Sequence, residues 1–102
     1  MENQVFVELL RRGYIPGKTL FYYRTRNDKE IDFVTRKGSK VEPLIQVCYD
    51  MSSEKTRKRE LDALVEAAEE LHCDNLLVIT NSQEEKIDWK NKTFMIITNN
   101  KF

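Results

Sequence analysis

The sequence lacks the features that mark several large classes of protein. It has one histidine and two cysteines, and no CxxC pair accompanies His72 and Cys73, so a structural zinc site is disfavoured. No apolar run approaches the roughly 18 residues that a membrane-spanning helix needs. The net charge is zero, with 17 basic and 17 acidic residues, so no overall basic field attracts nucleic acid, and any such binding needs a local patch.

Targeting and nucleotide-binding signals are also missing. No charged leader, apolar segment and cleavage site precede the first helical pattern, so we expect no secretory signal. Cys48 and Cys73 then indicate reduced thiols, and we expect a cytoplasmic location. No GxxxxGK[ST] motif occurs, so the nucleotide-binding module of any larger parent would lie outside these residues. The 102 residues, 40% of them apolar, fit one small globular domain.

The spacing of apolar residues predicts an α/β domain with a mixed sheet. Short turns join the first three strands, which we expect to form an antiparallel meander. A helix then leads to the fourth strand, so the third and fourth strands are expected to be parallel, with a right-handed crossover. The last strands are expected to close the sheet as a hairpin or an edge. The predicted helices cover residues 2–12 and the segment from 50–53 to about Leu71, and the predicted strands cover 19–25, 30–36, 43–49, 75–80, 87–89 and 93–98.

Polar residues interrupt the apolar pattern on two neighbouring strands. Since alternate residues of a strand share a face, Glu30, Asp32 and Val34 are expected on one face, opposite Ile31 and Phe33. On the next strand, Gln46 and Cys48 share a face. We therefore expect any functional site where Asp32, Gln46 and Cys48 meet.

These two strands resemble a known superfamily of nucleases. The element order, with Glu30-Ile31-Asp32-Phe33-Val34 followed by Ile45-Gln46-Val47-Cys48, resembles the PD-(D/E)xK nucleases, whose fold is called restriction-endonuclease-like. With residues 2–6 (ENQVF), 8–13 (ELLRRG) and 22–25 (YYRT), the chain is similar to the nuclease-like domain at the C-terminal end of AAA+-type ATPases of bacteria and archaea. The resemblance covers roughly Glu2 to Thr80. It implies an α-β-β-β-α-β core flanked by helices, and it implies that residues 1–102 are a C-terminal fragment of a larger ATPase.

The resemblance also implies a set of site positions, several of them altered. Active members use a helix-one Glu, a strand-two Asp and a strand-three Glu-x-Lys. Asp32 matches the Asp and is the implied metal position, while Glu2 and Glu8 both compete for the helix-one position. Gln46 replaces the second carboxylate, and Cys48 replaces the lysine. An amide brings no charge to Mg²⁺, and a neutral thiol cannot offset charge on a phosphate, so we expect degenerate catalysis and no cofactor, or weakly bound Mg²⁺ if activity survives.

Each of these residues also has a plain structural interpretation. Asp32 fits a polar residue on a half-exposed strand, and Gln46 fits a buried amide satisfied by its neighbours. Cys48 fits a small core side chain better than a nucleophile. Glu2 and Glu8 would ordinarily be solvated helix residues. Asp50 offers a replacement carboxylate, although a helix-entry cap is the preferred interpretation, and Lys55 or Lys58 offers a replacement lysine.

The second predicted helix has a reversed charge order. It begins with Lys55, Arg57, Lys58 and Arg59, and acids follow at Glu66, Glu69 and Glu70, which is unfavourable for the helix dipole. One interpretation is a solvated face with local ion pairs. The other is a basic surface for a phosphate backbone beside Asp32, extended by Arg11, Arg12, Arg24 and Arg26.

Together these features predict a degenerate nuclease-like domain attached to an AAA+-type ATPase, which binds DNA without cleaving it. Its expected partners are DNA and the ATPase module of its own parent chain, with no membrane. Two alternatives remain. One is an active Mg²⁺-dependent nuclease with a rearranged site, and the other is a protein-interaction domain that regulates the ATPase.

Overall fold

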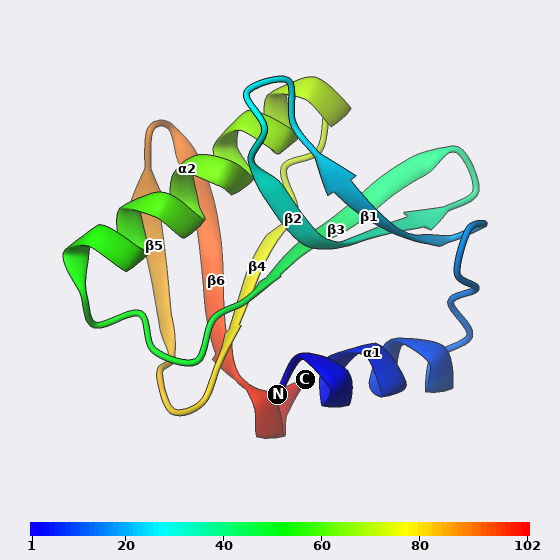
Figure 1. Cartoon of the computed structure of the whole chain (residues 1–102), viewed down its shortest axis with the longest axis horizontal. Coiled ribbons are helices and arrows are strands. Elements are labelled where there is room, and N and C mark those ends of the chain that lie inside the picture. The colour runs from blue at the N-terminus through cyan, green and yellow to red at the C-terminus, as the bar shows by residue number, and fades with distance from the viewer.

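The structure is a mixed β-sheet with one long helix on each face. The computed structural model describes all residues, 1–102. Its elements are α1 (Glu2–Arg11), β1 (Leu20–Arg24), β2 (Glu30–Lys37), β3 (Lys40–Val47), α2 (Glu54–Leu71), β4 (Leu76–Thr80), β5 (Glu85–Trp89), β6 (Lys92–Thr98) and the short 3₁₀ helix η1 (Asn99–Lys101). The strand order is β1-β2-β3-β4-β6-β5 (Figure 1). The predicted α/β class is confirmed.

The predicted connections between strands are confirmed as well. β1, β2 and β3 form an antiparallel meander, and α2 carries the chain to β4, which pairs parallel with β3. β5 and β6 form the closing hairpin. β6 pairs parallel with β4, so β4 takes the central position that its nearly all-apolar sequence predicts.

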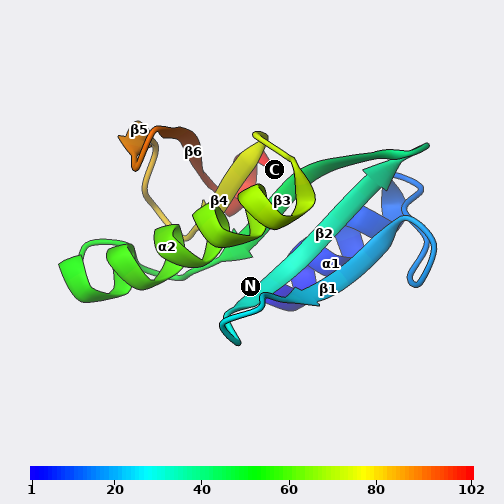
Figure 2. The same cartoon turned by 90° about the horizontal axis from the view of Figure 1, so that it is seen from above.

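The two helices bury separate cores on opposite faces of the sheet (Figure 2). On one face, α2 places Leu61 and Leu64 against strand residues such as Leu44. On the other, α1 buries Val5 and Leu9, which are four residues apart on one side of the helix. No helix of the structure has the length and apolar character that crossing a membrane requires.

β2 contains a β-bulge that the alternating pattern did not predict. Phe21 pairs with Val34 and Tyr23 with Ile31, so two steps along β1 span three along β2. Ile31 and Val34 consequently both face the core under α2, while Phe33 faces the core under α1. The predicted grouping of Glu30, Asp32 and Val34 opposite Ile31 and Phe33 is therefore wrong. The extra residue falls at 32–33, where a bulge redirects side chains.

The acids late in α2 hold the turn between β1 and β2. Glu66 accepts hydrogen bonds from the backbone N–H of Asn27 at 3.1 Å and pairs with Lys29 at 3.3 Å. Glu70 accepts from the backbone N–H of Arg26 at 3.0 Å and from the Tyr23 hydroxyl at 2.6 Å. The reversed charge order of α2 thus has a structural cause, because these contacts outweigh a small dipole penalty.

Candidate functional site: a cleft between the β1–β2 hairpin and α2

β2 and β3 separate at the point where the sequence places its site candidates. Their last paired residues in this direction are Phe33 and Ile45. Beyond them β3 follows β4, and the Cys48 N–H donates to the carbonyl of Ile79. The backbone groups of β2 before Phe33 consequently need other partners.

The Gln46 side chain supplies those partners. Its Oε1 accepts a hydrogen bond from the Asp32 N–H at 2.9 Å, and its Nε2 donates to the Glu30 carbonyl at 3.0 Å. The residue is only 2% exposed. The Gln46 amide therefore replaces the missing backbone hydrogen bonds of the sheet, and it is a buried amide satisfied by its neighbours. Its oxygen already accepts a hydrogen bond from the backbone.

Asp32 links the same two strands in the opposite direction, so that Gln46 and Asp32 together form a brace between β2 and β3. Its Oδ2 accepts from the Val47 N–H at 2.8 Å. Burial raises the pKa of Asp32 to about 6, partly offset by the Val47 N–H, and the nearby carboxylates of Glu2 and Glu60 raise it further. Asp32 is thus an acid that changes charge close to neutral pH.

The structure distinguishes between the two candidate acids of α1. Glu2 lies close enough to Asp32 to affect its pKa by charge and hydrogen bonding. Glu8 instead pairs with Arg12 at 2.9 Å and Arg11 at 3.5 Å. Glu2 belongs to the Asp32 site, whereas Glu8 is an ordinary paired residue of the helix surface.

Sequence reasoning missed Glu60, the acid that α2 contributes. Burial raises the pKa of Glu60, and Arg59 at 3.4 Å only partly offsets this effect. A signal was present in the sequence. Glu60 lies four residues before Leu64 and seven before Ala67, on the buried side of the helix, where an acid is unusual.

These donors do not form the magnesium site that the resemblance implies. The Gln46 oxygen and one Asp32 oxygen already accept backbone hydrogen bonds. No three side chains of Asp, Glu, His or Cys lie close enough together to hold a metal ion. Mg²⁺ favours a site with carboxylate oxygens and waters in octahedral geometry, and the residues here do not fit it.

Cys48 and Asp50 have structural roles near the same point. Cys48 is half-buried against the core under α2, and burial raises the pKa of its thiol, which keeps it neutral. Asp50 accepts from the Ser52 N–H at 2.9 Å, just before Ser53 caps α2. Asp50 therefore stabilises the entry to the helix, as preferred from the sequence.

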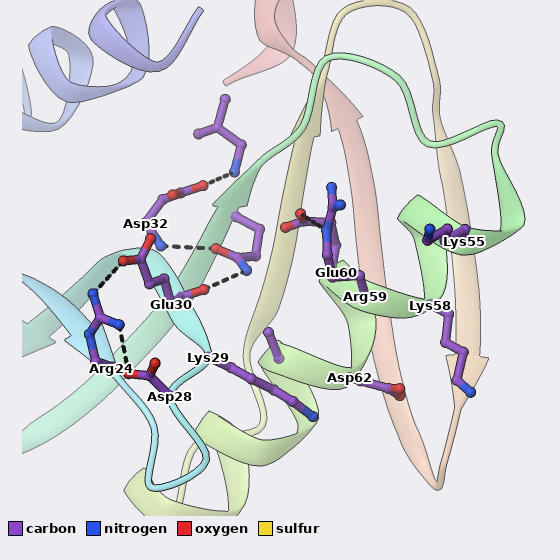
Figure 3. A pocket seen from close by; sticks show the side chains of 13 residues that line it. Arg24, Asp28, Lys29, Glu30, Asp32, Lys55, Lys58, Arg59, Glu60 and Asp62 are labelled. Carbon is purple, nitrogen blue, oxygen red and sulfur yellow. Dashed lines mark hydrogen bonds and ion pairs between the residues drawn. The ribbon is translucent and has the colours of Figure 1, made fainter.

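Around Asp32 and Gln46 the surface forms a cleft of about 660 Å³. The hairpin of β1 and β2 forms one wall and the first half of α2 forms the other (Figure 3). Charges of both signs line it in equal number, five basic and five acidic. The lining residues are Arg24, Asp28, Lys29, Glu30, Asp32, Gln46, Val47, Lys55, Lys58, Arg59, Glu60, Asp62 and Ala63.

The acids and bases of the hairpin wall largely neutralise one another. Arg24 pairs with Asp28 at 2.6 Å and with Glu30 at 2.5 Å. Lys29 pairs with Glu66. On the opposite wall, Asp62 accepts from the Trp89 indole at 2.8 Å and pairs with Lys90.

The free positive charge of the cleft lies on α2. Lys55 and Lys58 form no ion pair or side-chain hydrogen bond, and Arg59 is 68% exposed beside Glu60. We call Lys55, Lys58 and Arg59 the basic rim. The predicted contact Arg57 lies outside it, because its guanidinium binds Glu85 at 2.7 Å and the Met51 carbonyl at 3.1 Å. Arg11 and Arg12 are likewise occupied by Glu8, so of the predicted arginine extension only Arg24 lines the cleft.

Comparisons with known proteins give a family for the chain. Residues 1–99 match the family described as "Domain of unknown function (DUF4143)". A protein of Methanocaldococcus jannaschii, "Uncharacterized protein MJ1544", is 40% identical over 100 residues, covering 94% of this chain. The chain spans only 22% of the length of that relative. No solved structure matches the chain.

Proposed function

The chain belongs to the DUF4143 domain family, and from that premise we propose that it is a nuclease-like module that binds DNA without hydrolysing it. In this proposal the fold is restriction-endonuclease-like. Two observations support that choice: the α-β-β-β-α-β order of the first six elements, and a half-buried Asp32 at the diverging ends of β2 and β3. Glu2 of the first helix lies near that Asp32, as the nuclease resemblance implies.

The observation that carries the DNA-binding proposal is the basic rim. Lys55 and Lys58 form no ion pair with a protein carboxylate, although the charge of Lys58 helps to lower the pKa of Asp62, so both ammonium groups can contact an external partner. The two lysines are three residues apart on α2, a rise of about 4.5 Å along the helix axis, and both line the cleft. Because a phosphate backbone is a linear array of negative charges, the basic rim can pair with successive phosphates along it.

The lack of hydrolysis follows from Gln46 and Cys48. The Gln46 amide is held by two backbone groups, so it acts as a structural brace. The Cys48 thiol is neutral and offers no positive charge to a phosphate in the transition state. We therefore propose that the cleft retains the outline of a nuclease site and has lost its chemistry.

The proposed partner module is an ATPase in the same parent protein. Its basis is the similarity of residues 2–6, 8–13 and 22–25 to domains found at the C-terminal end of AAA+-type ATPases. The relative from Methanocaldococcus jannaschii, of which this chain spans 22%, is long enough to contain such a module. In this arrangement the domain would bring DNA to the motor or hold it there.

Fluorescence anisotropy with a labelled DNA oligonucleotide across a salt series tests the proposal. Three contacts from the basic rim predict a slope of log K against log salt of about −2 for single-stranded DNA or about −3 for a duplex. The double variant Lys55→Gln with Lys58→Gln removes two contacts and should flatten the slope by about 1.4 or 1.8. Absence of binding even at low salt would refute the proposal.

A matched control and a cleavage assay complete the test. Lys37 also lacks an ion pair and lies at the other end of β2, seven residues from Glu30, or about 23 Å at 3.3 Å per residue. Lys37→Gln should leave the slope unchanged. Cleavage of DNA with Mg²⁺ or Mn²⁺ that disappears in Asp32→Ala would support the active-nuclease alternative instead.

A further inference from the structure

The walls and the floor of the cleft differ in charge. The basic rim on α2 is exposed, whereas two acids that line the same cleft, Asp32 from β2 and Glu60 from α2, are half-buried and form its floor (Figure 3). No protein N–H donates to Oδ1 of Asp32 or to Oε2 of Glu60. Apart from the hydrogen bond between Glu2 and Asp32 and the ion pair between Arg59 and Glu60, the floor presents carboxylate oxygens without a protein partner, which would repel a phosphate and attract a hydrogen-bond donor.

We infer that the cleft takes single-stranded DNA with its bases pointing toward the floor, and that it favours cytosine and adenine over thymine. This inference rests on the proposed DNA binding. Cytosine and adenine carry exocyclic amino groups, which donate to carboxylates, whereas the corresponding position of thymine is a carbonyl acceptor. In a duplex these groups are paired and stacked, so only unpaired bases would reach into a cleft of about 660 Å³.

Tyr22 supplies a stacking surface beside the same cleft. The residue is 64% exposed on the edge strand β1. Its hydroxyl lies 3.5 Å from the guanidinium of Arg24, which lines the cleft. Aromatic rings next to basic grooves stack on unpaired bases of any type, so Tyr22 would hold a base adjacent to those on the floor.

Anisotropy titrations of the intact chain with labelled 12-mers test this inference. The probes are dC12, dA12 and dT12, and a mixed-sequence 12-mer in single-stranded and duplex form, all at one low salt concentration. We expect dC12 and dA12 to bind about 5-fold or more tightly than dT12, and the mixed single strand to bind more tightly than its duplex. Glu60→Gln introduces an amide donor and should reduce the preference against dT12. Tyr22→Leu should weaken single-strand binding about 5-fold or more, and Tyr22→Phe should retain it.

The possible outcomes separate this inference from the proposal beneath it. Equal affinity for dC12 and dT12, or a duplex bound as tightly as the single strand, would overturn the inference and leave DNA binding intact. Failure of every probe to bind would remove DNA binding itself. The comparison of probes uses the unmodified chain, so it holds even if a variant does not fold.

Discussion

Replacing Gln46 by Glu tests whether this residue is a structural brace or a ligand position that has drifted. Glu is what the nuclease resemblance expects at this position, and it has nearly the same shape as Gln. The structure nevertheless predicts a cost, because Nε2 of Gln46 must donate to the Glu30 carbonyl while Oε1 accepts from Asp32. An ionised carboxylate accepts hydrogen bonds only.

The expected cost follows from the contacts that are lost. The substitution removes one buried hydrogen bond and leaves a carbonyl facing a negative oxygen, which together amount to about 2–4 kcal/mol of unfolding free energy. Protonation restores a donor, so the introduced carboxyl has a raised pKa in the folded state. Its destabilisation is therefore smallest below the unfolded pKa of about 4.3 and grows as pH rises through the folded pKa.

Urea unfolding of the original and substituted chains at pH 4 and pH 7.5 measures the difference. Gln83 provides a matched control, because its side chain only accepts, from the Met51 N–H at 2.6 Å. Gln83→Glu keeps that acceptor and should change stability by less than about 0.5 kcal/mol at either pH. If Gln46→Glu is as stable as the original chain at pH 7.5, the amide does not brace the two strands.

Two further predictions concern titrating groups elsewhere in the cleft and its hairpin. Hydrogen bonds from the side chains of Thr25 and Asn27 lower the pKa of Glu66 to about 2, so the stabilisation by Glu66 is present above about pH 4.5 and lost as pH falls toward 2. Glu66→Ala should lower the free energy of unfolding by about 1–2 kcal/mol and speed amide hydrogen exchange at Asn27. Unchanged exchange at Asn27 would show that Glu66 does not hold the turn. Burial raises the pKa of Asp32 to about 6, so the contribution of Asp32 to stability is present below the pKa of the unfolded chain and lost as pH rises through 6. A carbon-13 NMR titration of the Asp32 carboxyl should give a midpoint near 6 and a lower midpoint in Glu2→Gln. A midpoint near 4 would show that Asp32 is neither buried nor close to Glu2.

The sequence predicted the sheet well and its local irregularity poorly. Alternation and short turns were sufficient for the meander, and the helix before Leu76 was sufficient for the parallel crossover. The bulge at 32–33 was not predictable from a two-residue period, because one inserted residue leaves the apolar composition of β2 unchanged. That residue nevertheless decides on which face Val34 lies.

The chemistry of the candidate site depends on contacts that the sequence does not display. Asp32 and Gln46 are neighbours as expected, yet only the structure shows that each binds the backbone of the other strand. Glu60 was missed because attention fell on the basic start and the later acids of α2, although its spacing from Leu64 places it on the buried side. Arg57 was grouped with the basic residues around it, and its partner Glu85 lies 28 residues away in the sequence.

The most direct test of the central claim is a map of amide chemical shifts on adding DNA. The nitrogen-15-labelled chain would be titrated with a 12-mer in the presence of Mg²⁺, and the DNA would be recovered at the end. We expect shifts that cluster on the walls of the cleft, at Lys29, Val47 and Lys58, together with intact DNA. Shifts confined to α1 and η1 on the other face of the sheet, or DNA cut at the end of the titration, would contradict it.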